Sequence, residues 1–489
     1  MALENLDKDL MSIHEARTLI AKAKKAQQLF TDFSQEKVND IIKAVTEAAE
    51  AESERLAKMA HEETGFGIWQ DKVIKNKFGS RTVYEHIKDL KTVGILKNDK
   101  EKRIMEVAVP VGIIAALIPS TNPTSTTMFK ALVSLKAGNA VIFSPHPNAK
   151  KCIIETAKIL NDAAIKAGAP EGLIGCMTVL SIQGTSELMK HKDIALILAT
   201  GGEAMVNAAY SSGNPAIGVG PGNGPAFIEK SADVQLAVKR ILDSKTFDNG
   251  TICASEQSIV VEKCMKAKVM TELQKQGAYF LSEEDSDKLG KFILRANGTM
   301  NPAIVGKSVH VIANLAHLNV PENTRVLISE QTSVGKFNPY SREKLAPILA
   351  FYVEEDWEKA CKKCIELLMN EGKGHTLVLH SNNEEIIKEF ALKKPVSRLL
   401  VNTPGALGGI GGSTNLVPSL TLGCGAIGGS ATSDNVGPMN LINIRRIAYG
   451  VRELEELRGS AIEETNGAIP DKYIDLIVNK ILERLANQK

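Results

Sequence analysis

Between residues 112 and 210 the chain switches repeatedly from a short apolar segment to a longer amphipathic one, and this alternation constrains its fold most strongly. Short apolar runs between turn signals predict strands, whereas apolar residues spaced three and four apart predict helices. Strands that alternate with helices form a parallel, doubly wound sheet, which binds ligands at the carboxyl ends of its strands. The pattern predicts strands at 112–119, 140–143, 175–180 and 194–198, and helices at 149–167 and 203–210.

A second region of the same kind follows residue 253. It predicts strands at 258–261, 309–312 and 348–353 and a helix at 355–369. A chain of 489 residues is long enough for two or three domains with sizeable cores. We therefore expect an α/β protein that has one doubly wound parallel sheet and a second α/β domain.

The remaining segments have distinct patterns. A helix is predicted from Ser12, with Glu15 completing a capping box, and a second long helix runs from about Gln35 to a stop at Gly65. Alternating residues at 94–110 predict a hairpin. The tail, 449–489, predicts a polar linker and then an amphipathic helix whose apolar stripe is Ile474, Ile477, Val478, Ile481, Leu482 and Leu485.

Charge and cysteine content exclude several classes of protein. The 59 Lys and Arg residues balance 57 Asp and Glu residues, so we expect no nucleic-acid partner and no anionic membrane surface. We find no signal peptide, and the longest apolar run, 111–118, is too short to span a bilayer. Seven scattered cysteines indicate a reducing cytoplasm. Cys361 and Cys364 lie in a helical pattern that no further ligands complete, so we expect no metal site.

Cys253 is a candidate nucleophile. It follows the turn signal Asn249-Gly250, precedes an apolar strand and has small neighbours that would leave its sulfur accessible. A thiolate at this position could form a covalent intermediate with a carbonyl substrate. The alternative is that Cys253 is a small buried apolar residue, as most free cysteines are.

Three other places carry candidate groups, each with a plain structural alternative. Thr200-Gly201-Gly202 could bring helix N-terminal N–H groups to a pyrophosphate, or it could be an ordinary helix start. The amide of Asn122 could donate to an oxyanion, although Asn before Pro is also a common loop element. Glu343 precedes a strand and could hold a ribose or be solvated.

Several motifs, taken in order, resemble the aldehyde dehydrogenase superfamily across about residues 12–450. They are IPSTNPTST, KAGNAVIFSPHPNAK, LATGGEAMV, GVGPGNGPAFIEKSADV, FDNGTICASEQS and EKLAPIL. The CoA-acylating branch is the most similar, including the aldehyde half of the bifunctional aldehyde/alcohol dehydrogenases. FSPHPNAKK, GVGPGN and the glycine-rich stretch at 405–437 carry that closer resemblance.

The resemblance implies a domain organisation. Residues 1–93 and 111–235 would form a Rossmann-type dinucleotide-binding domain, and residues 236–435 a catalytic domain. Segments 94–110 and 436–448 would form the arm through which subunits pair, giving a homodimer or homotetramer. Residues 449–489 would be the linker and C-terminal helix, which resembles the short tails that direct enzymes into bacterial microcompartments. The alternative is a helix that packs on its own or a neighbouring subunit.

The resemblance also implies roles for individual residues. Cys253 would be the nucleophile, and Asn122 together with the Cys253 N–H would bind the oxyanion. Glu343 would contact the nicotinamide ribose. The remaining coenzyme contacts would be Ser144, Pro145, Thr200, Gly201, Gly202 and Gly220.

One departure from the family separates two reactions. Hydrolytic members carry a glutamate that activates water about where this chain has Val219, and residues 213–227 contain no carboxylate. Water without a base attacks a neutral thioester poorly, whereas a partly ionised thiol needs less help. The sequence therefore predicts NAD-dependent, reversible conversion of an aldehyde, first acetaldehyde, to an acyl-CoA.

Several alternatives remain open from the sequence. They are a hydrolytic aldehyde dehydrogenase, a microcompartment enzyme for propionaldehyde or a substituted aldehyde, and a non-catalytic protein on this fold. The stretch Ser144-Pro145-His146-Pro147 also lacks the acid that often reads the ribose 2′-hydroxyl, which leaves NAD against NADP open.

Overall fold

The computed structural model describes residues 7–458 and 471–486. These residues form two compact units. The first unit contains residues up to 94 and residues 108–443; the second contains residues 95–107 and the chain from 444 onward.

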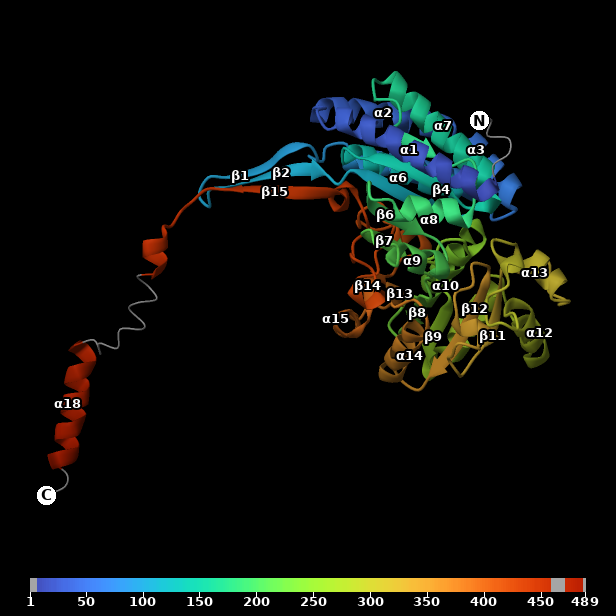
Figure 1. Cartoon of the computed structure of the whole chain (residues 1–489). Helices are drawn as coiled ribbons and strands as arrows, with labels where there is room; N and C mark the ends of the chain where they lie inside the picture. The colour runs from blue at the N-terminus through green and yellow to red at the C-terminus, as the bar shows by residue number, and fades with distance from the viewer. Residues whose placement is uncertain (1–6, 459–470, 487–489) are drawn as a thin grey trace. The chain divides into compact units, whose positions relative to one another are not determined.

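The first unit holds two parallel sheets (Figure 1). The first sheet has the strand order β5-β4-β3-β6-β7, and all its pairs are parallel. In this order the chain leaves the central strand β3 first toward one edge and then toward the other, which creates a switch point between β3 and β6. The strands are β3 (Ile113–Ile118), β4 (Ala140–Pro145), β5 (Ile174–Cys176), β6 (Ile194–Thr200) and β7 (Ala216–Val219).

Helices cover this sheet because its central strands are apolar throughout. Every residue of β3 and β4 is buried, so both faces are covered. One group of helices, which pack against one another, consists of α2 (Gln35–Ala51), α6 (Pro123–Lys136) and α7 (Lys150–Lys166). A second packed pair is α1 (Lys8–Phe30) with α8 (Ile182–Lys190). Helix α9 (Glu203–Tyr210) follows β6 directly.

The second sheet has seven strands in the order β10-β11-β12-β9-β8-β13-β14, again all parallel. Its strands are β8 (Pro225–Ile228), β9 (Ser258–Glu262), β10 (Ala278–Phe280), β11 (Val326–Glu330), β12 (Ile348–Glu354), β13 (Gly374–His380) and β14 (Val396–Val401). Alternate side chains along these strands enter two different cores, because successive residues of a strand point to opposite faces.

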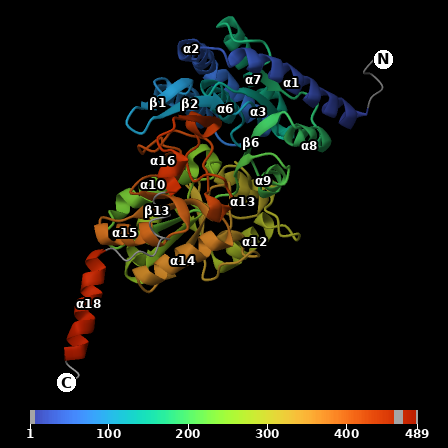
Figure 2. The ribbon, with the colours of Figure 1, turned by 60° about the vertical axis from the view of Figure 1, so that its left-hand side comes forward.

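Each core of the second sheet is closed by its own helices (Figure 2). Phe227 and Val260 pack with α12 (Glu283–Ile293), α13 (Val309–Leu315), α14 (Trp357–Asn370) and α15 (Glu384–Lys393). Ile259 and Val261 pack with α10 (Val234–Thr246) and α11 (Lys266–Lys275). The predicted α/β class with doubly wound parallel sheets is therefore confirmed.

The strand predicted at 309–312 is wrong, because these residues begin helix α13. Ser308 caps this helix, its Oγ accepting a hydrogen bond from the Val311 N–H. Val309, Ile312 and Ala313 are the buried residues, and this spacing belongs to a helix. A short apolar run alone does not separate the two structures.

The first predicted N-terminal helix begins earlier than expected. The second has the predicted start at Gln35 and stop at Gly65 but is interrupted. Helix α1 begins at Lys8 with Asp7 as its cap, and Ser12 lies inside it, where its Oγ donates to the Val179 carbonyl. The second predicted helix is divided at Glu52 into α2 and α3 (Ser53–Thr64). Both deviations come from contacts or backbone angles that a local pattern does not contain.

The second unit contains most of the predicted hairpin, β1 (Gly94–Asp99) and β2 (Ile104–Pro110), and most of β15 (Ile442–Ala448), which pair in the order β1-β2-β15. Arg446 Nε donates to Glu106 Oε1 across β2 and β15 at 3.1 Å. Helix α18 (Asp471–Ala486) covers most of the predicted C-terminal helix, and its apolar stripe from Ile474 to Leu485 is exposed. Within the described residues, no helix has the length and apolar character that crossing a membrane requires.

Candidate active site

A cavity of about 1040 Å³ lies where the first sheet ends. The last residues of β3, β4, β6 and β7 line it, as expected for ligand binding at the carboxyl ends of parallel strands. All the residues that the sequence pointed to line this one cavity: Asn122, Ser144, Pro145, Thr200, Gly201, Gly202, Gly220, Cys253 and Glu343.

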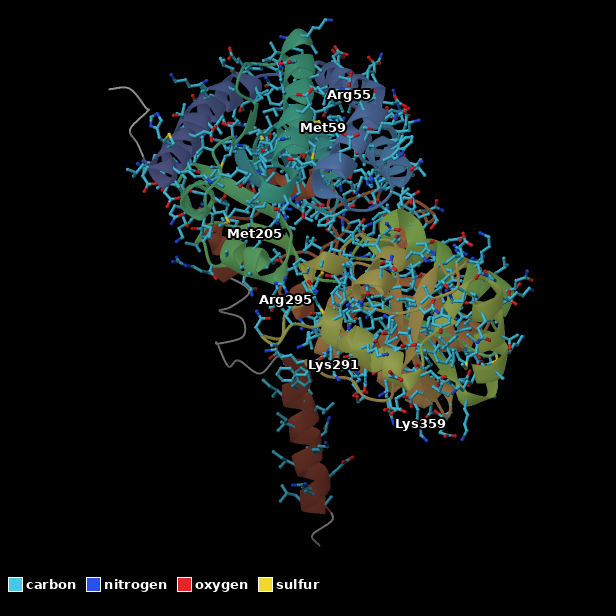
Figure 3. All side chains as sticks on the ribbon, turned by 90° about the vertical axis from the view of Figure 1, so that its right-hand side faces the viewer. Arg55, Met59, Met205, Lys291, Arg295 and Lys359 are labelled. Carbon is cyan, nitrogen blue, oxygen red and sulfur yellow. The ribbon has the colours of Figure 1, made fainter. Side chains whose placement is uncertain are left out.

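The first-sheet wall of the cavity has polar groups that fit a dinucleotide phosphate. The buried hydroxyl oxygen of Thr200 has no hydrogen-bond partner among the described residues. Gly202 is the N-cap of α9, so the free N–H groups of that helix begin at the cavity. Met205, labelled in Figure 3, lies on α9 and lines the same wall. These groups can hold a pyrophosphate.

The opposite wall comes from the turn that precedes β9. Asp248 and Asn249 have φ of 48° and 52°, a left-handed conformation that Asp and Asn tolerate better than most residues. Gly250 follows with φ 76°. This tight turn presents Cys253 to the cavity before the chain enters β9 at Ser258.

The loop from β7 to β8 fixes the position of Cys253. A side chain at Gly222 would place its Cβ 2.1 Å from the Cys253 carbonyl oxygen, so only glycine permits this close approach. The Gly222 N–H donates to Glu343 Oε1 at 2.8 Å. Burial, with a smaller contribution from Glu371, raises the pKa of Glu343 to about 8.

Asn122 is turned toward the cysteine loop. It is the N-cap of α6, but its side chain makes no capping bond. Its Nδ2 donates to the Thr251 carbonyl at 3.1 Å, and its Oδ1 accepts from Lys75 Nζ at 2.6 Å. The amide nitrogen therefore lies beside the loop that carries Cys253, where an oxyanion donor is needed.

The surroundings of Cys253 disfavour its thiolate form. Burial raises the pKa of Cys253 to about 12, with further increases from Glu343 and Cys424, while Arg398 opposes the shift. A thiol reacts as its thiolate, so activation of Cys253 depends on nearby positive charge.

Arg398 supplies such a charge, although no sequence motif pointed to it. It is 4% exposed, and no carboxylate of the described residues pairs with its guanidinium. Its donors go to uncharged groups, among them the Gly423 carbonyl at 2.7 Å and the His375 carbonyl at 3.2 Å. The sequence signal that could have identified Arg398 is its position in β14. It precedes the buried Leu400 by two residues, so the two side chains lie on the same buried face of the strand.

His375 was also missed from the sequence. Its Nδ1 lies 3.0 Å from Thr376 Oγ1, while its buried Nε2 has no partner among the described residues. A Cβ on Gly222 would lie 3.2 Å from the His375 ring, so the imidazole is close to the nucleophile's loop. Burial, aided by Arg398, lowers the pKa of His375 to about 3. The ring is thus neutral near pH 7 and a weak base.

We expect Arg398→Leu to slow alkylation of Cys253 by iodoacetamide at neutral pH. Losing the cation raises the thiol pKa, which leaves about tenfold less thiolate at neutral pH for each unit by which the pKa rises. Peptide mass spectrometry gives the rate at Cys253 and, as internal control, at the exposed Cys264. Arg398→Lys keeps the charge and should retain most of the reactivity. Equal slowing at both cysteines would contradict this role.

The predicted helical position of Cys361 and Cys364 is confirmed, because both lie on α14. Both are buried, and Lys394 Nζ donates to Cys361 Sγ. Within the ranges that the structure describes, no group of three or more His, Cys, Asp or Glu side chains is arranged to hold a metal ion.

Comparison with known proteins identifies the family to which the chain belongs. Residues 9–318 match the model of the aldehyde dehydrogenase family. The chain is 47% identical over 442 residues to the bifunctional aldehyde-alcohol dehydrogenase of Escherichia coli K12, with 89% of this chain and 50% of that protein covered. It thus spans about half the length of that relative.

Two crystal structures are similar over nearly their whole length. A probable aldehyde dehydrogenase from Listeria monocytogenes EGD-e has 67% identity and a TM-score of 0.92, covering 92% of this chain and 100% of that one. An acetylating aldehyde dehydrogenase from Geobacillus thermoglucosidasius has 51% identity and a TM-score of 0.90, covering 92% and 99%. With its family match, its identity to these proteins and its cysteine-bearing cavity, the chain belongs to the aldehyde dehydrogenase family.

Proposed function

We propose that this chain is a CoA-acylating aldehyde dehydrogenase. It converts an aldehyde, NAD⁺ and CoA to an acyl-CoA, NADH and a proton, and the reaction is reversible. Acetaldehyde is the proposed first substrate. The observation that carries the proposal is a cavity that holds Cys253 and Asn122 beside a β7–β8 loop without any carboxylate.

Cys253 and Asn122 perform the first step. The Cys253 thiolate attacks the aldehyde carbonyl and forms a hemithioacetal oxyanion. Asn122 Nδ2 and the Cys253 N–H then donate hydrogen bonds to that oxygen, which lowers the barrier as charge develops. Arg398 favours the thiolate before attack. Loss of hydride from the hemithioacetal carbon leaves a thioester on Cys253.

The first-sheet wall would hold the coenzyme. NAD, when bound, supplies the hydride acceptor. Thr200, Gly201 and Gly202 would contact its pyrophosphate through a hydroxyl and the N–H groups of α9. Ser144, Pro145 and Gly220 would lie along the rest of the coenzyme, and Glu343 would contact the nicotinamide ribose.

The last step needs a nucleophile other than water. Val219 packs in an apolar cluster with Phe78, Ile252, Ala254 and Cys253, so the position of the hydrolytic base carries no charge. A CoA thiol is partly ionised near neutral pH and needs less assistance. A propionaldehyde dehydrogenase from Rhodopseudomonas palustris, 26% identical with a TM-score of 0.81, was crystallised with CoA and an acylated cysteine, which supports this acceptor.

A panel of aldehydes with and without CoA tests the proposal. We expect acetaldehyde to give acetyl-CoA and NADH in equal amounts, with propionaldehyde and substituted aldehydes ranked by kcat/KM. Chromatography of the products distinguishes the thioester from the free acid. Free carboxylic acid formed at an undiminished rate without CoA would reject the acylating reaction in favour of hydrolysis.

For its partners, we propose a cytoplasmic homodimer or homotetramer paired through the three-stranded sheet of the second unit. We further propose that α18 docks the enzyme inside a bacterial microcompartment. The exposed stripe on α18 supports docking. A propionaldehyde dehydrogenase from a Clostridium phytofermentans fucose-utilisation microcompartment, 28% identical with a TM-score of 0.80, supports the location.

Deleting residues 460–489 should leave kcat and the melting temperature nearly unchanged. The reason is that the described side chains of α18 bury little surface in the chain. Steady-state kinetics and thermal unfolding of the truncated protein check this. A large fall in either quantity would show that the helix is part of the fold.

A further inference from the structure

Two lysines on α4 (Trp69–Lys77) converge on one buried carboxylate. Lys72 and Lys75 lie almost one helical turn apart and are 2% and 3% exposed. Their Nζ atoms lie 2.9 and 2.5 Å from Asp248 Oδ2, in the turn before the nucleophile. Asp71 Oδ2 accepts from the Asp248 N–H at 2.7 Å and adds a second negative charge near Lys75, so charge pairing alone does not distinguish the two lysines.

The two lysines differ in their other contacts. Lys75 Nζ also lies 2.6 Å from Asn122 Oδ1 and 2.9 Å from Thr251 Oγ1. Lys72 Nζ instead reaches the Thr121 carbonyl at 3.2 Å and makes no bond to the Asn122 side chain. Lys75 therefore links the amide of Asn122 to the turn that carries Cys253.

The contact with Lys75 and the bond to the Thr251 carbonyl together fix which way the Asn122 amide faces. An ammonium group only donates hydrogen bonds, so the atom it meets is the amide oxygen. The amide nitrogen then faces the other way, 3.1 Å from the Thr251 carbonyl and 3.2 Å from Thr121 Oγ1. A flipped amide would place an oxygen where negative charge develops during the reaction.

We propose that Lys75 is the positioning residue of the oxyanion site, holding the Asn122 amide with its N–H groups toward the reacting carbonyl and polarising it as a donor. The inference rests on the proposed oxyanion role of Asn122. A hydrogen bond to a charged partner is stronger than a neutral one, and donation to the amide oxygen makes the amide N–H a better donor in turn.

The ionisation of Lys75 gives a pH signature. Burial lowers the pKa of Lys75 to about 8; Lys72 lowers it further, whereas Asp248 and Asp71 raise it. The ring of Phe247, 5.6 Å from Nζ, also faces the cation. The protonated lysine orients Asn122 most strongly. The ratio of the wild-type kcat to the Asn122→Ala kcat should therefore fall above about pH 8.

The matched pair Lys75→Met and Lys72→Met tests the inference in the full-length enzyme. Each removes one cation from Asp248, but only Lys75→Met also removes the contacts with Asn122 and Thr251. We expect Lys75→Met to lower kcat by about tenfold or more with KM for NAD nearly unchanged. Lys72→Met should lower kcat less. In an Asn122→Ala background, Lys75→Met should lower kcat no further, because its partner is absent.

The outcomes separate this inference from the proposed function. Wild-type kcat in Asn122→Ala would reject the oxyanion role itself. Suppose that Asn122→Ala has a low kcat. If Lys75→Met and Lys72→Met then lower kcat equally, or if Lys75→Met lowers the kcat of Asn122→Ala further, Lys75 does not act through Asn122. If Lys75→Met does not fold, a second measurement tests the inference. It is the ratio of wild-type to Asn122→Ala kcat from about pH 6.5 to about pH 9.5, a range that brackets the pKa of Lys75. A ratio that stays constant across this range would overturn the inference.

Discussion

Cys253→Ala should fold, bind NAD and make no NADH from any aldehyde. The thiolate is the atom that bonds to the carbonyl, so no hemithioacetal forms and no hydride leaves. Loss of a nucleophile typically lowers kcat by on the order of 10⁴-fold or more. Absorbance at about 340 nm, where NADH but not NAD⁺ absorbs, measures the rate, and NADH fluorescence in a titration measures coenzyme binding.

Two other cysteines are the controls for this variant. Cys264 is exposed, and Cys424 is buried near Arg398. Cys264→Ala should behave as the wild type, while Cys424→Ala should retain turnover because its sulfur is not the one that lines the cavity. More than a trace of activity in Cys253→Ala, at an unchanged melting temperature, would reject the nucleophile assignment.

Without CoA, NADH production should stop after about one equivalent per active site, or continue only slowly. The thioester on Cys253 then waits for an activated nucleophile. General-base assistance is typically worth about 10²–10⁴-fold, and the β7–β8 loop offers water no such base. Stopped-flow absorbance gives the burst amplitude, and adding CoA should restore steady turnover.

A control variant tests the cause of this slow step. Val219→Glu places a carboxylate in the apolar cluster next to Cys253 and should raise the rate of acid formation modestly. Steady NADH production without CoA in the wild type would contradict the proposed acceptor. It would mean that another group, such as Glu343, activates water.

The fold followed from patterns within single segments. Strands such as β6 and helices such as α9 have local signals, apolar runs and a glycine turn, so the parallel sheets could be predicted from sequence. The strand predicted at 309–312 failed because a four-residue apolar run fits either structure and the capping hydroxyl of Ser308 decides between them. Ser12 failed because its hydroxyl bonds Val179, a contact 167 residues away.

The candidate site likewise contains residues that local motifs predict and residues that they do not. Cys253, Asn122 and the residues of the first-sheet wall lie in short motifs, and the structure brings them to one cavity. Lys75, which bonds partners 47 and 176 residues away, has no such motif. Arg398 likewise reaches the site from β14 through carbonyl groups of other segments. Contacts of this kind depend on the packing of whole elements and are not visible in local spacing.

The glycine loop between β7 and β8 limits how this enzyme can be redesigned. A side chain at Gly222 would collide with the Cys253 carbonyl, and one at Gly224 would lie 2.8 Å from the Thr376 carbonyl. At Gly220, by contrast, an added Cβ meets no atom within 4 Å. A new acidic side chain at Gly220, beside Val219, would therefore leave Cys253 in place. Because Gly220 also lies along the proposed coenzyme path, engineers who want a carboxylic acid as the product must keep that side chain clear of NAD.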